Sequence, residues 1–271
     1  MPRAIIGISG WRYASWRGDF YPKGLRQADE LGYVAERLDS VEINGSFYSL
    51  QRPTSWMRWR DTVPGGFVFA VKGPRFVTHM KRLRDVDEAL ANFFASGVLA
   101  LGSRLGPIVW QTPADLAYDP EVVDRFLDRL PRSTGSALEL AGRRHERMHG
   151  REHLEVDADR PLRHAFEPRH PSFDSAEFAA AAAAREVAIV VADSAGTWPV
   201  IDRVTEGFGY ARLHGDTELY ASGYSPEALD RWADWTRRHL DAGRDAYVYF
   251  DNDARGHAPH DAVALRAHLE P

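Results

Sequence analysis

The chain of 271 residues contains no cysteine, and this absence removes several kinds of chemistry at once. Disulfide bonds, thiolate zinc sites, iron–sulfur ligation and cysteine nucleophiles are all excluded. The basic residues are nearly all arginine, because Lys23, Lys72 and Lys81 are the only lysines. A lysine that ends an apolar segment, as Lys72 does, is therefore a conspicuous residue.

Long apolar runs and a strong net charge are also absent. No segment approaches the roughly 20 apolar residues of a membrane span, and the N-terminus lacks the apolar stretch of a signal peptide. We therefore expect a cytoplasmic protein that does not associate with membranes. The formal net charge is -5 and no basic run stands out, so nucleic acid is not an expected partner. These features do not indicate an oligomeric state.

Eight apolar segments, separated mostly by helical patterns, each carry polar residues at the carboxyl end. The segments are Ala4–Ser9, Ser40–Tyr48, Phe67–Lys72, Pro107–Gln111, Leu162–Glu167, Ala188–Asp193, Phe208–His214 and Ala246–Asp251. This alternation predicts an α/β fold, a (β/α)₈ TIM barrel, with residues 1–271 as a single domain. A doubly wound open sheet usually shows a glycine-rich phosphate fingerprint after its first strand, and residues 7–11 do not supply one.

Helix signals fix several of the connections. Asp119-Pro120 and Ser225-Pro226 each place a capping residue before a proline at the first helical position. Gly243 is expected to end the helix that starts at Ser225, and Gly97 to break the helical pattern of residues 85–105.

Two segments depart from the strand–helix repeat. Between residues 132 and 160 the apolar periodicity dissolves, which predicts an elaborated segment between strands four and five. The loop that follows the first strand carries Trp11, Tyr13, Trp16, Phe20 and Tyr21. So many aromatic residues form either a lid over a pocket or a plug for one end of the core.

Several motifs, taken in order, resemble one protein family. They are Gly7-Ile-Ser-Gly-Trp-Arg-Tyr, Val41-Glu-Ile-Asn-Gly-Ser-Phe-Tyr, Phe67-Val-Phe-Ala-Val-Lys-Gly-Pro-Arg-Phe, Glu167 with Arg169-His170, Tyr210-Ala-Arg-Leu-His-Gly and Tyr247-Val-Tyr-Phe. Together they are similar to the DUF72 (YecE-like) family of uncharacterised proteins, nearly from end to end. The resemblance implies a TIM barrel and no settled activity. Asp251 stands where that family usually has asparagine, so the resemblance implies no role for Asp251.

The carboxyl ends of barrel strands form the working face of such folds, and this chain concentrates ionisable residues there. Burying so many charges would not benefit a core, so they indicate a functional site. The candidate catalytic residues are Glu42, Lys72, Glu167, His170 and His214. The candidate substrate-binding residues are Trp11, Tyr13, Asn44, Tyr48, His79, Gln111, Arg169, Arg212 and Asn252. The alternative is a structural network, in which a residue such as Glu42 holds a neighbouring arginine or lysine.

The first functional hypothesis is a metal-independent enzyme that performs acid–base chemistry on a small anionic substrate. Lys72, Arg169 and Arg212 would bind a carboxylate or phosphate. Glu167 or Glu42 would act as the general base, and His214 or His170 as the general acid. Lys72 could instead form a Schiff base. Hydrolase, lyase and isomerase reactions are not distinguished by these residues.

Two other classes of function stay open. Glu167, Asp193, His214 and Asp251 end strands five to eight and form a plausible ligand set for Mg²⁺, Mn²⁺ or Zn²⁺. That set would resemble the sites of sugar isomerases or abasic-site endonucleases. The third class is a non-catalytic protein that binds a small ligand.

Overall fold

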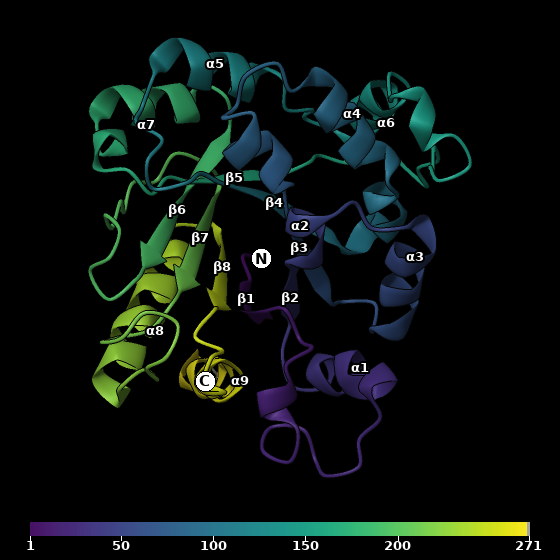
Figure 1. The fold of residues 1–271 in the computed structure, drawn as a ribbon. Coiled ribbons are helices and arrows are strands. Elements are labelled where there is room, and N and C mark those ends of the chain that lie inside the picture. Colours follow the sequence, from purple (N-terminus) through teal and green to yellow (C-terminus); the bar gives the residue numbers. More distant parts are fainter. Residues whose placement is uncertain (270–271) are drawn as a thin grey trace. The chain divides into compact units, whose positions relative to one another are not determined.

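The structure is a computed structural model that describes residues 1–269 (Figure 1). Eight strands follow one another in sequence order around a closed barrel, and their paired neighbours run parallel. They are β1 (Ala4–Ser9), β2 (Ser40–Ile43), β3 (Val68–Lys72), β4 (Leu105–Gln111), β5 (His164–Glu167), β6 (Val187–Asp193), β7 (Phe208–Leu213) and β8 (Asp245–Phe250). With helices between the strands, this order confirms the predicted TIM barrel.

The α-helices are α1 (Glu30–Ala35), α2 (Gly45–Tyr48), α3 (Pro53–Thr62), α4 (Asp87–Ala95), α5 (Pro120–Asp128), α6 (Thr134–Ala141), α7 (Ala176–Ala183), α8 (Pro226–Asp241) and α9 (His257–Leu269). The 3₁₀- and π-helical segments are η1 (Ala14–Trp16), η2 (Gln27–Asp29), η3 (Phe76–Met80), η4 (Val98–Arg104), η5 (Glu146–Met148) and η6 (Pro171–Phe173). No helix among residues 1–269 combines the length and apolar character that crossing a membrane requires.

The chain divides into two compact units. Unit 1 comprises residues 1–42 and the chain from residue 188 onward, and unit 2 comprises residues 43–187. Unit 1 holds β1, β7, β8 and most of β2 and β6. Unit 2 holds β3, β4 and β5 with the helices from α2 to α7. The assignment of residues 1–271 to one domain stays a prediction.

The helix signals in the sequence are confirmed. The Asp119 carboxylate accepts a hydrogen bond from the backbone N–H of Val122 at the start of α5, at 3.3 Å. The Ser225 hydroxyl caps α8 in the same way. Gly97 has a φ of 105° and separates α4 from η4, a left-handed conformation that favours glycine.

The second strand is shorter than its sequence pattern predicts. The apolar alternation extends to Tyr48, but β2 ends at Ile43 and residues 45–48 form the single helical turn α2. The hydroxyl of buried Ser46 donates to the backbone carbonyls of Ile43 and Lys72, at 3.0 and 2.7 Å. These bonds hold the turn against the end of β3 instead of letting β2 continue.

The elaborated segment between strands four and five contains one more helix than its composition indicated. Helix α6 begins with a reciprocal capping box between Ser133 and Ser136 and packs against α4. Beyond it, η5 is a single turn without buried residues. The sequence pattern missed α6 because its apolar stripe is short.

The core of unit 2 lies between the strands and the helices that cover them. Trp110 on β4 contacts Phe93 of α4 and Phe126 of α5 edge to face. Phe166 on β5 also lies beside Phe126. Trp110 and Phe166 thus face the helices. The residues next to them along each strand therefore face the other side of the sheet.

Candidate functional site

The predicted site residues of unit 2 lie on one face of three neighbouring strands. The parallel register aligns Lys72 of β3 with Val109 of β4, and Gln111 of β4 with Glu167 of β5. Val109 and Gln111 are two residues apart and therefore point to the same side. Lys72, Gln111 and Glu167 thus share the face opposite to the helices, at the carboxyl ends of their strands.

Lys72 is held above an aromatic ring. Its ammonium nitrogen lies 4.2 Å from the centre of the Phe47 ring, and Phe47 is presented by α2. Such a cation–π contact favours a fixed position for the charge. Gly73 follows Lys72 directly, and a Cβ at that position would lie 2.3 Å from the indole of Trp110. The close approach of backbone and indole therefore fixes the end of β3 as well.

Glu167 and Arg169 form an ion pair at the end of β5. The Arg169 Nε donates to Glu167 Oε1 at 2.8 Å, the Glu167 side chain is fully buried, and the Arg169 side chain is nearly so. Pro168 separates the two residues and cannot extend the sheet ladder, which matches the predicted strand end. The arginine therefore balances the buried carboxylate.

The pKa of His79 is sensitive to the charges around the ends of β3, β4 and β5. Burial first, and then the positive charges of Lys72, Arg169 and Arg75, lower the pKa of His79 to about 4. Its Nδ1 lies 2.9 Å from the Thr78 hydroxyl, and its Nε2 lies 3.4 Å from the amide nitrogen of Gln111. His79 is therefore neutral near pH 7 and lies in a locally positive environment.

In unit 1, the predicted residues Glu42 and Arg212 form a buried ion pair. Arg212 donates through Nη2 to Glu42 Oε1 at 2.7 Å and through Nε to Oε2 at 3.1 Å. Ser9 donates to Oε1 at 2.9 Å, and Tyr210 donates to Oε2 at 2.6 Å. Each oxygen of Glu42 thus accepts two hydrogen bonds, the arrangement expected of a structural carboxylate that holds an arginine.

Asp251 extends this network to His214. Its Oδ2 lies 2.8 Å from Arg212 Nη2 and 3.1 Å from His214 Nδ1. The His214 side chain is fully buried, and its ring meets the rings of Trp198 and Tyr220 edge to face. Asp251 thus lies within ion-pair distance of both Arg212 and the His214 imidazole. A catalytic role for His214 stays a prediction.

The aromatic loop after β1 is packed rather than exposed. Trp11, Trp16, Phe20 and Tyr21 are all buried, and Tyr21 donates its hydroxyl proton to the carbonyl of Trp11 at 2.7 Å. This packing favours the plug interpretation of the loop over the lid. Tyr13 is half-buried and donates to the carbonyl of Ser9 at 2.8 Å. Burial and the nearby carboxylates of Asp253 and Asp251 raise the pKa of Tyr13.

Other predicted residues have structural contacts. Buried Asn252 donates through Nδ2 to the Ser222 carbonyl and to Asp261. His170 uses Nδ1 to cap η6, where it accepts from the backbone N–H of Ser172 at 3.2 Å. By contrast, Tyr48 projects into solvent and is 71% exposed. Asn44 is half-buried and directly follows the last residue of β2.

The sequence also offered Glu167, Asp193, His214 and Asp251 as an alternative set of metal ligands. Asp193 accepts a hydrogen bond from the Trp232 indole at 3.3 Å, and burial raises the pKa of this carboxyl group. Across residues 1–269 no group of three or more histidine, aspartate or glutamate side chains has an arrangement suited to a metal ion. The metal hypothesis stays a prediction without support from a ligand cluster in the described chain.

Three residues that contact the predicted site residues were not identified from the sequence: Ser9 and Tyr210, which bond to Glu42, and Phe47, which contacts Lys72. Ser9 ends β1 just as Lys72 ends β3, so the rule that identified Lys72 would also have identified Ser9. Tyr210 lies two residues before Arg212 and shares its side of β7, which is a readable signal. Phe47 carried no signal, because its contact with Lys72 depends on the turn α2.

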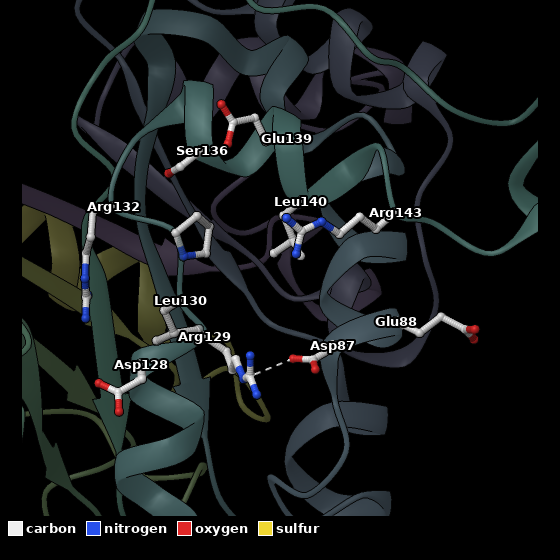
Figure 2. A pocket seen from close by; sticks show the side chains of 11 residues that line it. Asp87, Glu88, Asp128, Arg129, Leu130, Arg132, Ser136, Glu139, Leu140 and Arg143 are labelled. Carbon is white, nitrogen blue, oxygen red and sulfur yellow. Dashed lines mark ion pairs between the residues drawn. The ribbon is translucent and has the colours of Figure 1, made fainter.

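A surface depression of about 660 Å³ lies among α4, the end of α5 and α6 in unit 2. In Figure 2 its side chains are of both signs, and Arg129 points towards Asp87, 3.3 Å away. Both residues are exposed to solvent. None of the predicted site residues lines this depression, so the rim of β3, β4 and β5 is the better candidate site of unit 2.

Comparisons with known proteins agree with the sequence motifs. The model of a family described as "Protein of unknown function DUF72" matches residues 5–271. The UPF0759 protein YecE of Escherichia coli (strain K12) is 28% identical over 138 residues, which cover 50% of this chain and 47% of that protein. The chain thus spans about half the length of the curated relatives it matches.

Solved structures agree on the fold. A DUF72 family protein from Thermotoga maritima has a TM-score of 0.79 and 23% identity, with 99% of this chain and 100% of that chain covered. One from Enterococcus faecalis has a TM-score of 0.75 and 15% identity, with 98% and 95% covered. At these identities the likeness shows the fold alone. Because the family model covers nearly the whole chain, we conclude that the chain belongs to the DUF72 family of proteins of unknown function.

Proposed function

We propose that this protein is an enzyme that performs acid–base chemistry on a small anionic substrate at the rim of unit 2. The observation that carries the proposal is the shared face of Lys72, Gln111 and Glu167, with Arg169 beside Glu167. A substrate carboxylate or phosphate would bind between the Lys72 ammonium and the Arg169 guanidinium. Both groups donate charge-assisted hydrogen bonds, and arginine adds a planar pair of donors.

The remaining groups of this rim have matching roles. Glu167 is the general base, because it is the buried carboxylate that shares a face with Lys72 and is oriented by Arg169. Gln111 and neutral His79 supply hydrogen bonds without adding charge. The low pKa of His79 supports the proposal, since the same cations that repel a proton attract an anion.

Anion binding is tested directly by isothermal titration calorimetry with inorganic phosphate and with succinate. The Lys72→Met and Arg169→Met variants should each weaken binding roughly tenfold, because each loses a charged hydrogen-bond donor. Lys81→Met is the matched control, since Lys81 is an exposed lysine of the same unit. The proposal fails if neither anion binds, or if the control weakens binding as much as the rim variants do.

Catalysis is tested separately from binding. Wild-type protein is incubated with panels of phosphorylated and carboxylated metabolites, and substrate loss is followed by mass spectrometry. Turnover that disappears in Glu167→Gln supports the enzyme. Tight binding without conversion across the panels would instead favour a protein that only binds a small ligand.

A further inference from the structure

A groove borders the proposed anion site within unit 2. Its volume is about 410 Å³, within the range of small-molecule pockets. Phe47, Tyr48 and Leu50 line it from the chain after β2, and Phe76 and Met80 line it from the chain after β3. We call these five residues and the space between them the aromatic groove. The aromatic groove is also lined by Pro74 and Arg75, which follow closely after Lys72 at the end of β3.

The aromatic groove concentrates apolar surface. Among the described residues eight large apolar side chains are exposed, and Tyr48, Leu50, Phe76 and Met80 are four of them. Tyr48 and Met80 are the most exposed of the four, at 71% and 65%. Apolar side chains scattered singly over a surface need no explanation, but a cluster around a hollow marks a binding surface.

Phe47 joins the groove to the anion site. Its ring lines the groove, while the ammonium of Lys72 lies 4.2 Å from the centre of the same ring. The rings of Phe47 and His79 meet edge to face at 5.1 Å. A ligand whose charged group pairs with Lys72 would therefore have its uncharged part next to Phe47.

The charges at the groove fit an anion with an aromatic part. Arg75 lines the groove, is exposed, and is one of the cations that lower the pKa of His79. Glu88 is the acidic residue of the lining. Three of the lining side chains, Phe47, Tyr48 and Phe76, are aromatic and can pack edge to face or offset against a ring.

We propose that the aromatic groove binds a planar ring of the substrate whose anionic group is held by Lys72 and Arg169. The substrate class is thus an anion that carries an aromatic ring next to its carboxylate or phosphate. This inference rests on the function proposed above and narrows its substrate. The groove contributes affinity and selectivity, and the reaction itself stays with Glu167.

The test compares three ligands that share a phosphate group: inorganic phosphate, butyl phosphate and phenyl phosphate. Binding to full-length protein is measured by isothermal titration calorimetry. Wild type should bind phenyl phosphate roughly tenfold more tightly than inorganic phosphate, as expected for one ring that stacks and loses its hydration. Butyl phosphate should fall between the two.

Variants then locate the ring. Phe76→Ala combined with Met80→Ala should remove the advantage of phenyl phosphate and leave the affinity for inorganic phosphate unchanged. Both side chains are exposed, so the double variant should fold, and circular dichroism verifies this. Lys72→Met should weaken all three ligands. Val204→Ala, an exposed apolar residue of unit 1, is the control and should change none of them.

The possible failures are distinguishable. If wild type binds no phosphate ligand, the proposed anion site falls, and this inference falls with it. If inorganic phosphate binds but phenyl phosphate gains nothing, or keeps its gain in the double variant, only the groove proposal is overturned. Equal affinities for butyl and phenyl phosphate would overturn the assignment of a planar ring.

Discussion

Arg212 and Glu42 form a bidentate ion pair in which both side chains have no exposed surface. Removing one partner of a buried pair leaves an uncompensated charge, which is strongly destabilising. Glu42→Gln should therefore lower the free energy of unfolding by about 3 kcal/mol, the lower end of the usual range, because Asp251 still contacts Arg212. Urea unfolding followed by tryptophan fluorescence measures the change.

The paired replacement Glu42→Gln with Arg212→Met is the control for that prediction. It removes the buried charge together with its partner, and it should restore part of the lost stability. A Glu42→Gln variant as stable as wild type would contradict the structural role. Glu42 would then return to the set of catalytic candidates.

Glu167→Gln is expected to separate function from stability. The Arg169 side chain keeps 11% exposure and glutamine keeps the size and one acceptor oxygen of glutamate, so Glu167→Gln should lose less stability than Glu42→Gln and should stay folded. Activity in the metabolite screen should disappear, since an amide cannot accept a proton as a general base. The variant is compared with wild type by circular dichroism and by turnover. Loss of folding together with activity would place Glu167 among the structural residues.

The buried imidazole of His164 should make stability depend on pH. Its Nδ1 accepts from the Trp110 indole at 3.2 Å, its Nε2 lies 2.8 Å from the Pro131 carbonyl, and burial lowers its pKa to about 4. The unfolded chain therefore binds this proton more readily than the folded one. Neutral His164 therefore contributes its full share of folding stability above the ordinary histidine pKa of 6.5. This contribution is lost as the pH falls from 6.5 towards 4.

The size of that loss can be measured against a variant. Between about pH 7 and about pH 4.5, His164 should account for roughly 2 kcal/mol of lost stability. His164→Asn should be less stable at neutral pH and should show a correspondingly smaller pH dependence in urea titrations. Half-buried His79 contributes in the same direction and is unchanged in both proteins. An equal pH dependence in both would exclude His164 as the source.

Gly73→Ala should destabilise the end of β3. The new Cβ would lie 2.3 and 2.4 Å from two carbons of the Trp110 indole, inside a packed interior. Overpacking of this kind costs about 1–3 kcal/mol, and it should also weaken phosphate binding because Lys72 precedes Gly73. Gly65→Ala meets no atom within 4 Å and is the matched control. Thermal unfolding that is the same for both variants would contradict the packing argument.

The strand–helix repeat was readable because each strand is a local apolar run with its own start and end. The sequence also suggested a structural alternative in which Glu42 holds a neighbouring arginine or lysine, and the structure pairs Glu42 with Arg212. What the sequence could not supply were contacts that depend on turns. Phe47 reaches Lys72 only because β2 stops at Ile43 and the chain turns into α2. Likewise, Asn252 was predicted to bind substrate, and its bonds to Ser222 and Asp261 appear only in three dimensions.

The packing of Gly73 against Trp110 also restricts which residues these two positions can carry together during evolution. The space that a side chain at position 73 would need is occupied by the indole at position 110, which belongs to a different strand. A larger residue at either position is therefore acceptable only with a smaller one at the other. In a set of DUF72 sequences, these two positions should vary together, and a glycine at one should accompany a large aromatic residue at the other.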